Sequence, residues 1–572
     1  MATDFQVRGT NDAAIFTLKV HRGDGMALLA MNWKRGEPTA DFVGFAIEYR
    51  EPGGQRFFAL KNRLGFLRAD GTVDPRTLST LESPIQKFRW VHFPRNAELE
   101  GDFVYRVTPV FMNERDERSL GEAQQVAIEL RRDTYPGVLN VSFTRGFVSS
   151  QAFVDKYVTA TNGVQTLLPA RADGGLTFVP THPRRVEALA WMGFEARRSI
   201  LDLLEAAIAD PKAQVRVVAY DLNEPGILTR LERLGPRLEV IIDDSDTHGE
   251  ATSAETGAAA RLMTSAGADK VRRQHMGRLQ HNKTIVVNGP TVKAVVCGST
   301  NFSWRGLYVQ SNNAVVVRGT KVVSAFTAAF DAYWANSTVA GFGATSSATW
   351  VDVNPGSVSL RVAFSPHTAR NALLASVGAD IATAKSSLFY SLAFLYQTTG
   401  PVRDAIEQVT RNDQRFVYGI SDRKVGGGLD LLKPDGNRAP VYSAAISGDL
   451  PEPFKSEPSG GAGIRMHHKF VVIDFDKPTA RVYVGSYNFS SPADVSNGEN
   501  LLLIRNRRIA VSYMVEALRT FDHYHFRVNQ QQAARKRKTL HLQRPPRKTG
   551  EVAWWKEDFV DPRKILDREL FA

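Results

Sequence analysis

The spacing of hydrophobic positions divides this chain into regions of different kinds. Before about residue 131, short apolar or alternating runs are separated by turn-forming residues such as Ala69-Asp70-Gly71, a pattern that predicts strands. The predicted strands are Ala27–Trp33, Phe42–Arg50, Arg56–Leu60, Phe103–Phe111 and Gln124–Leu130. After about residue 184, apolar strand-like runs alternate with amphipathic helical patterns, which predicts α/β units.

The alternation of helix and strand occurs twice. The first series predicts helices over Arg184–Ile208 and Pro225–Leu234 and strands over Val215–Tyr220, Leu238–Asp243 and Val292–Cys297. The second predicts helices over Asn371–Lys385 and Pro401–Thr410 and strands over Val358–Phe364, Ser386–Leu392, Arg415–Ile420, Phe470–Asp474 and Val482–Val484. Because the order of elements restarts after a stretch rich in Gly, Ser, Thr and Ala, the sequence predicts an internal duplication.

These patterns predict a multidomain fold with an all-β sandwich followed by two α/β halves. The predicted boundaries are 1–131 for the sandwich, 132–183 for a connector, 184–337 for the first half, 338–356 for a linker, 357–530 for the second half and 531–572 for a basic C-terminal extension.

Each half carries the same polar motif. His281-Asn282-Lys283 opens a strand in the first half and is followed by Gly298-Ser299-Thr300-Asn301-Phe302-Ser303. His467-His468-Lys469 opens a strand in the second half and is followed by Gly485-Ser486-Tyr487-Asn488-Phe489-Ser490. The glycine follows the first histidine at nearly the same distance in both copies (298 − 281 = 17; 485 − 467 = 18). The chain is therefore expected to contribute two half-sites.

The residue types of this motif suit cleavage of a phosphodiester. The reaction needs a nucleophile, a proton for the leaving oxygen and positive charge near the phosphoryl oxygens. Histidine can serve as nucleophile or acid near neutral pH. We therefore expect His281 and His467 to be catalytic together with Lys283 and Lys469. The expected phosphate-binding side chains are Ser299, Asn301, Ser486 and Asn488. No Cys, His and Asp cluster has metal-ligand spacing, so we expect no metal and no cofactor.

The doubled motif resembles the signature of the phospholipase D superfamily, which is His-x-Lys-x4-Asp followed by Gly-Ser-x-Asn. The resemblance covers roughly residues 185–530 and is closest to the nuclease-like branch. It implies that the two halves are phospholipase-D-like and form a pseudo-twofold pair around one site. It also implies hydrolysis through a phosphohistidine intermediate.

The two copies differ at positions that the resemblance marks as supporting. The second half keeps Asp474 where the first has Asn288, and it has Glu499 where the first has Asn312. In the superfamily this glutamate is thought to bond the far ring nitrogen of a catalytic histidine. A carboxylate favours the protonated imidazole more than a neutral amide does. We therefore expect Glu499 to pair with His467 as general acid and base, and Asn312 to orient His281 as nucleophile.

The charge of the chain favours a polyanionic partner. The chain has 572 residues, a formal net charge of +12 and a sequence pI near 9.6. Arg272, Arg273 and Arg278 precede the first motif, and a basic cluster lies in the last forty residues. These features favour nucleic acid. Two alternatives stay open: a phospholipase D acting on phospholipid headgroups, with Trp554-Trp555 meeting an anionic membrane, and a catalytically dead binding module.

The ends of the chain give weaker signals. Trp33, Tyr49 and Tyr105 resemble the core of a fibronectin type III or immunoglobulin-like sandwich, a module that usually docks a protein partner. The N-terminus has no basic and apolar leader, and no window reaches the ~18 to 20 apolar residues of a membrane span. We therefore expect a cytoplasmic protein, although a route of secretion that needs no signal peptide would leave no trace. The sequence does not say whether loops 245–270 and 422–463 gate the site.

Overall fold

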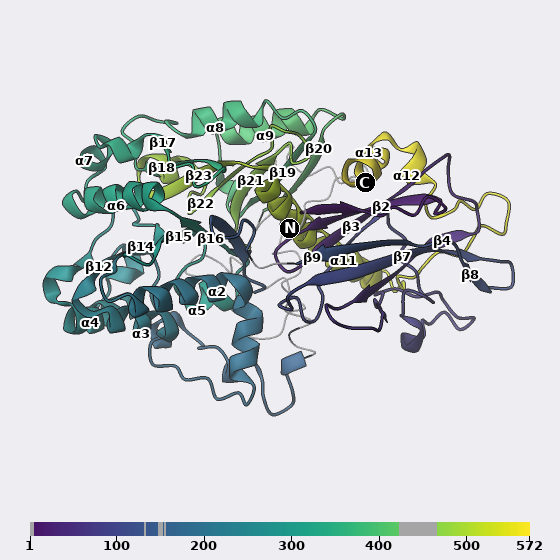
Figure 1. Ribbon diagram of the computed structural model, residues 1–572, viewed down its shortest axis with the longest axis horizontal. Helices are drawn as coiled ribbons and strands as arrows, with labels where there is room; N and C mark the ends of the chain where they lie inside the picture. The colour runs from purple at the N-terminus through teal and green to yellow at the C-terminus, as the bar shows by residue number, and fades with distance from the viewer. Residues whose placement is uncertain (1–4, 131–132, 147–152, 154–155, 422–465) are drawn as a thin grey trace. The chain divides into compact units, whose positions relative to one another are not determined.

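The computed structural model describes all residues except 1–4, 131–132, 147–152, 154–155 and 422–465 (Figure 1). The expected loop 422–463 therefore lies outside the described residues. The chain divides into two compact units. One contains the N-terminal residues up to 130 and the C-terminal residues Val511–Ala572, and the other contains the described residues between Asp133 and Ala510.

The first unit is built on two antiparallel sheets. One has the order β1-β2-β3-β6, with β1 Gln6–Arg8, β2 Phe16–Arg22, β3 Ala27–Trp33 and β6 Arg89–His92. The other has the order β5-β4-β7-β8, with β5 Phe58–Ala59, β4 Phe42–Arg50, β7 Asp102–Met112 and β8 Arg118–Leu120, and β9 Gln124–Glu129 also pairs with β7. Alternate side chains of both sheets, such as Leu18 and Ile47, share one core. The region is thus a β-sandwich, and its likeness to fibronectin type III stays a prediction.

The C-terminal segment belongs to the core of this unit, which the sequence did not predict. Trp555 is 5% exposed within the sandwich core, and Trp554 packs on Phe42 and Phe88 at 5.5 Å between ring centroids. The helices of this end of the chain are α11 Arg507–Arg535, α12 Glu557–Val560 and α13 Pro562–Phe571. The segment that was predicted as a basic extension therefore completes an apolar core.

Two seven-stranded sheets form the second unit. The first has the order β10-β16-β15-β14-β11-β12-β13, and its strands are β10 Leu139–Phe143, β11 Gln214–Ala219, β12 Leu238–Ile242, β13 Val271–Arg273, β14 Lys283–Asn288, β15 Lys293–Gly298 and β16 Asn313–Arg318. The second has the order β17-β18-β23-β22-β21-β19-β20, and its strands are β17 Val351–Asp352, β18 Ser359–Ser365, β19 Ser387–Leu392, β20 Phe416–Ile420, β21 Lys469–Ile473, β22 Arg481–Gly485 and β23 Glu499–Arg505.

Six strands occupy matching places in the two sheets, which confirms the predicted pair of halves. In each sheet the strand that opens with the His-x-Lys lysine, β14 or β21, lies between the first strand of a parallel pair and the strand that ends at the motif glycine. Both motif strands are central. β21 is apolar at every position after Lys469, and β14 is apolar at positions 285–287, which fixes their register.

The matching places also correct one boundary. Strand β10 pairs with β16 as β18 pairs with β23, so β10 is the counterpart of β18. It lies within 132–183, which was predicted to be a connector. Part of that segment is therefore the first strand of the first half. The apolar run at Val138–Phe143 is the signal for it, but Pro136-Gly137 just before it gave the segment the look of a loop.

Helices cover both sheets of this unit. They are α2 Arg185–Ala209, α3 Pro225–Leu234, α4 Ala254–Ala266, α5 Trp304–Tyr308, α6 Thr320–Ala335, α7 Val339–Gly343, α8 Leu374–Ile381, α9 Pro401–Thr410 and α10 Ser491–Val495. The polar, Ala-rich stretch 245–270 is ordered and contains α4. Among the described residues, no helix combines the length and the apolar character that crossing a membrane requires.

The buried C-terminal tryptophan gives a test of the first unit. Trp555→Ala should lower the free energy of unfolding of the first unit by about 3–5 kcal/mol, because the change removes a large side chain from a packed core. Urea unfolding measures the difference. Val552→Ala is the matched control, since Val552 lies three residues away and is 61% exposed. Equal stability of the two variants would show that the C-terminal segment contributes nothing to the core.

Candidate functional site

Two short parallel β-bridges join the halves at the site. Gln280 bridges to Gly498, and Ser311 bridges to Met466. Backbone hydrogen bonds reinforce them, because Gly498 N donates to Leu279 O at 2.8 Å and His467 N donates to Ser311 O at 3.0 Å. Each bridge joins the residue before one motif histidine to a residue next to the supporting position of the other half. The two motifs are therefore held in a fixed register.

The bridges bring the two histidines together with exchanged partners. The rings of His281 and His467 lie 6.4 Å apart between centroids. His281 Nδ1 lies 2.8 Å from Glu499 Oε2, and His467 Nδ1 lies 2.9 Å from Asn312 Oδ1. Both partners belong to the opposite half. Each histidine is buried, with 4% and 5% of its surface exposed.

This arrangement contradicts the predicted pairing of Glu499 with His467 and of Asn312 with His281. The physical reason is the half-to-half bridge: Glu499 directly follows Gly498, which bridges to the residue before His281. A supporting residue therefore reaches across the boundary and not back along its own sheet. Nothing in the local sequence indicates this, because the partner of His281 is 218 positions away.

The two motif lysines surround the histidines with buried positive charge. Lys469 Nζ lies 3.0 Å from His467 Nε2, and Lys283 Nζ donates to His281 O at 2.5 Å. Burial lowers the pKa of Lys283 to about 8, and burial together with Lys283 lowers the pKa of Lys469. Burial and the two ammonium groups also hold the pKa values of both histidines well below the usual value. Burial raises the pKa of Glu499 to about 7.

The serines of the Gly-Ser-x-Asn stretches do not point where they were expected. Ser299 Oγ donates to Asn312 Oδ1 at 2.9 Å, and Asn500 N donates to Ser486 Oγ at 3.0 Å. Both serines are fully buried behind the residues that contact the histidines. They bond the supporting residue Asn312 and the residue after Glu499, so this geometry does not support their expected contact with phosphate, and that of the asparagines stays a prediction.

The asparagines of the same stretches carry unused hydrogen-bonding capacity. The Oδ1 atoms of Asn301 and Asn488 are buried, and neither has a partner among the described residues. The other end of the Asn301 amide is held, because its Nδ2 donates to Asp221 Oδ2 at 2.6 Å. An unsatisfied buried amide is costly unless a ligand completes it. These oxygens can only accept a hydrogen bond, so a phosphoryl oxygen would have to be bound by the N–H groups of the same amides.

The motif aspartate and its first-half replacement lie away from the site, at the far ends of their strands. Asp474 Oδ1 accepts the backbone N–H groups of Lys385 and Ser386 at 2.8 Å each, which secures the start of β19. Asn288 is exposed and accepts a hydrogen bond from Lys293 Nζ at 3.1 Å. Their expected supporting role is therefore structural, and the loss of the aspartate in the first half does not alter the site.

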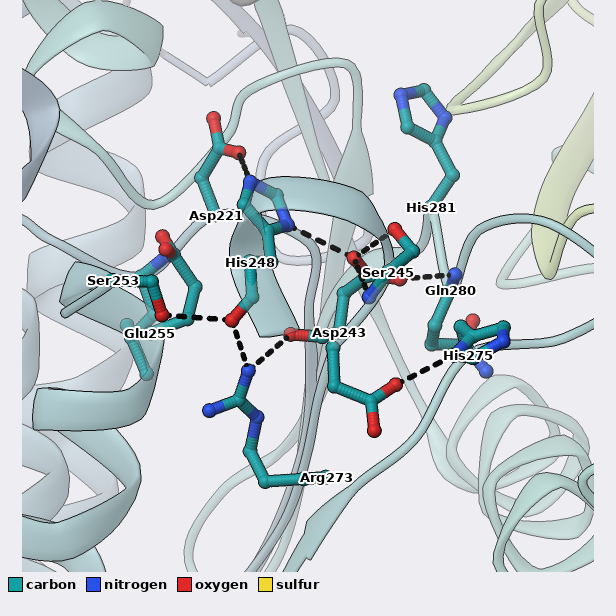
Figure 2. A network of polar contacts seen from close by, with 12 residues as sticks. Asp221, Asp243, Ser245, His248, Ser253, Glu255, Arg273, His275, Gln280 and His281 are labelled. Atoms are coloured by element: carbon teal, nitrogen blue, oxygen red, sulfur yellow. Dashed lines mark hydrogen bonds and ion pairs between the residues drawn. The ribbon is translucent and has the colours of Figure 1, made fainter. Parts of the chain in front are cut away.

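A third histidine, which the sequence interpretation missed, lies beside the site (Figure 2). His248 Nδ1 lies 2.9 Å from Asp243 Oδ2, and its Nε2 lies 3.2 Å from Asp221 Oδ1. The two aspartates follow β12 and β11, which are parallel neighbours. The carboxyl ends of parallel strands meet at one edge of a sheet, so this convergence could have been predicted from the two strands.

The same region is where a metal ion would find ligands. Among the residues that the structure describes, Asp221, His248 and Glu255 place one ligand atom each within 4.8 Å of one another. Both ring nitrogens of His248 already contact carboxylates, so the group is complete as an ion network. We therefore assign it no metal.

Comparisons with known proteins agree with this geometry. A family model described as "Cardiolipin synthase, PLD-like domain" matches residues 204–334 and 381–520, one segment in each half. A search of curated proteins finds no match to this chain.

Solved structures with related folds are only distantly similar. Phosphatidylserine synthase from Haemophilus influenzae Rd KW20 is 14% identical, with a TM-score of 0.41 over 60% of this chain and 92% of that one. Polyphosphate kinase from Porphyromonas gingivalis is 10% identical, with a TM-score of 0.38 over 59% of this chain and 48% of that one. Nuc from Salmonella typhimurium, a phospholipase D family member, is 23% identical, with a TM-score of 0.20 over 24% of this chain and 87% of that one.

The buried Glu499 predicts how the free energy of unfolding changes with pH. Its folded pKa of about 7 lies above the ordinary value of 4.5, so folding favours its neutral form. The wild type then loses stability as pH rises through this range, and the loss is complete above about pH 7. Glu499→Gln avoids the loss. Its free energy of unfolding should exceed that of the wild type by on the order of 3 kcal/mol at pH 8 and by little at pH 5.

Urea unfolding at the two pH values measures this difference. Glu407→Gln is the control, because Glu407 pairs with Arg403 in α9 at the surface of the same unit and its change should give no pH-dependent gain. A destabilised Glu499→Gln variant at pH 8 would contradict the electrostatic account.

Proposed function

We propose that this chain, a member of the phospholipase D superfamily through its two phospholipase-D-like domains, hydrolyses phosphodiester bonds through a phosphohistidine intermediate. The observation that carries the proposal is the exchanged pairing of the histidines. His281 Nδ1 faces a carboxylate, and its Nε2 makes no hydrogen bond to any described residue. One imidazole is thus oriented and free at the reacting atom, and the other lies opposite it.

His281 is the better nucleophile. When Nε2 attacks phosphorus, the N–P bond forms and the ring becomes positively charged. Glu499 faces the Nδ1–H at that moment and stabilises the charge, as the carboxylate does in other carboxylate–imidazole pairs. The corrected pairing therefore keeps the nucleophile that the sequence suggested, but for a different reason: the carboxylate supports the attacking ring.

His467 is the general acid and then the general base. Its partner, Asn312, is neutral, so the ring gives up a proton more readily than a carboxylate-paired ring would. A bound phosphodiester anion favours the protonated ring before reaction. The proton moves to the leaving oxygen as the P–O bond breaks. His467 then takes a proton from water, which attacks phosphorus and breaks the N–P bond.

The lysines and asparagines act on the nonbridging oxygens. Lys283 and Lys469 supply positive charge in a buried setting, where it is only weakly screened. The side-chain NH2 groups of Asn301 and Asn488 can donate hydrogen bonds to these oxygens, since the NH2 of Asn301 carries a second N–H beside the one that Asp221 accepts. Because these groups are fixed before the substrate arrives, they need no reorganisation as charge develops.

A trapping experiment should distinguish the roles of the two histidines. A p-nitrophenyl phosphodiester suits it, because this leaving group departs without a proton. His467→Asn should still form the intermediate and then accumulate acid-labile phosphate on the protein, with turnover reduced by roughly 10²–10⁴-fold. His281→Asn should form none. Acid-labile phosphate on His281→Asn but not on His467→Asn would reverse the roles.

Nucleic acid is the substrate class that we propose. The chain carries a formal net charge of +12, and the exposed Arg278 lies three residues before His281 at the junction of the halves. Two earlier arguments now carry less weight. Arg273 donates to the backbone oxygens of Asp243 and His248, so it is committed within the fold. Arg544 and Arg547 in the basic C-terminal segment pair with Asp116.

A phospholipid substrate is the second candidate. The description of the matched family model, a cardiolipin synthase domain, supports it. The expected membrane contact through Trp554-Trp555 does not, because these side chains lie in the core of the first unit. A protein partner for the β-sandwich stays a prediction.

A parallel substrate assay tests the proposal. Purified protein in EDTA is given single-stranded nucleic acid, double-stranded nucleic acid and mixed phospholipid vesicles, with His281→Asn as the control. We expect cleavage of nucleic acid, which His281→Asn abolishes. Cleavage of headgroup esters alone would identify the second candidate. Cleavage of neither, with no difference between the two proteins, would indicate a dead binding module.

A further inference from the structure

His248 joins two parts of the catalytic site through a continuous chain of hydrogen bonds (Figure 2). The imidazole lies in the short helix η6, Asp246–Gly249, between Asp243 and Asp221. Asp243 Oδ1 accepts the backbone N–H of Gln280 at 2.6 Å, and Gln280 immediately precedes the nucleophile. At the other end, Asp221 Oδ2 accepts Asn301 Nδ2 at 2.6 Å.

A second path also leads from His248 to the nucleophile. The ring of Tyr220 lies 4.6 Å from that of His248 and 4.7 Å from that of His281, between centroids. Lys283 Nζ lies 4.6 Å from the centre of the same ring. A displaced His248 would therefore disturb both the backbone and the ring that pack against the nucleophile.

The network is charged and mostly buried. Burial alone would lower the pKa of His248, but the hydrogen bonds to Asp221 and Asp243 raise it to about 10. The charged groups that face the imidazole are Asp221 after β11, Asp243 after β12, Glu255 in α4 and Arg273 in β13. Arg273 Nη2 and Ser253 Oγ both donate to His248 O, which fixes the backbone of η6.

The second half has a different residue in the place of Asp221. Ala219 pairs with Lys283 in the first sheet, and Leu392 pairs with Lys469 in the second. Asp221 lies two positions after Ala219, and Phe394 lies two positions after Leu392. The two residues therefore occupy corresponding positions in the two halves. The Asn301 amide is held by a carboxylate, whereas the residue at the corresponding position of the second half is apolar.

We propose that His248 is a positioning residue that, as a doubly protonated bridge between Asp243 and Asp221, fixes the Asn301 amide relative to His281. The proposal rests on the proposed function, because it assigns Asn301 to the phosphoryl oxygens. In physical terms, His248 sets the distance between Asp243 and Asp221. With both ring nitrogens donating, the two aspartates are held apart at a set separation, and with them the nucleophile and the amide.

A double-mutant cycle tests the bridge without requiring turnover. The variants are His248→Gln, Asn301→Ala and their combination, and the probe is tungstate, a phosphate analogue, whose Kd is measured by calorimetry. We expect His248→Gln to weaken binding roughly ten-fold in the wild-type background and hardly at all when Asn301 is already Ala. With a p-nitrophenyl diester, kcat should show the same dependence.

The chain offers a matched control. His275 bonds Asp244 at 2.7 Å and is labelled beside the network in Figure 2, but its side chain is 49% exposed. His275→Gln should leave both Kd and kcat unchanged. Thermal unfolding of every variant separates positioning from loss of fold, since a merely structural His248 would lower Tm and give effects that add to those of Asn301→Ala. Additive effects would overturn the proposal.

The protonation of His248 can be observed directly. In protein with ¹⁵N-labelled histidine, we expect both ring nitrogens of His248 to carry protons at pH 8, with the signals identified by their loss in His248→Gln. One unprotonated ring nitrogen would overturn the bridge. So would a Zn²⁺-induced rise in Tm that His248→Gln abolishes, because the ring would then bind a cation in place of its second proton.

These outcomes are distinct from failure of the proposed function. Wild-type protein that binds tungstate with the expected coupling but cleaves no diester would contradict hydrolysis and leave the bridge intact. If the wild type cleaves a diester but the effects of His248→Gln and Asn301→Ala add, the bridge is contradicted and hydrolysis stands. Wild-type protein that fails to bind tungstate would count against both.

Discussion

The parallel bridges Gln280–Gly498 and Ser311–Met466 are the constraint on which the site depends. Each is only one residue pair long, yet together they determine which side chain of one half meets which histidine of the other. A slip of one residue would turn Glu499 to the opposite face of its strand and away from His281. The large sheets hold each half rigid. The bridges fix the register between the two halves, which are far apart in sequence.

The electrostatics of the site follow from that register. Two lysines and two histidines are removed from water around the carboxylate of Glu499, whose burial is itself unfavourable. Such an arrangement costs stability, and it persists because the surrounding strands are fully packed. An anionic substrate would offset part of the excess positive charge.

Sequence patterns predicted the elements, and they singled out the histidines and lysines that the structure brings together, because both depend on local properties of the sequence. Helices Pro225–Leu234 and Pro401–Thr410 were predicted to the residue, since a proline at the start and an amphipathic face define each. The pairing of Glu499 could not be predicted, because it depends on the packing of two distant segments. The role of Trp555 was also missed: a tryptophan within a charged segment gives no local sign of the core that it completes.

The presence of both halves in one chain has a consequence for the orientation in which a diester binds. In a dimer of identical halves, both histidines would have the same partner, and a diester could bind equally well either way round. Here one histidine faces a carboxylate and the other a carboxamide, and among the described residues an aspartate holds Asn301 but none holds Asn488. The two ends of the site are chemically different. A nucleic-acid strand would then lie in the site with a single polarity, and every cut would leave its phosphate on the same side of the break.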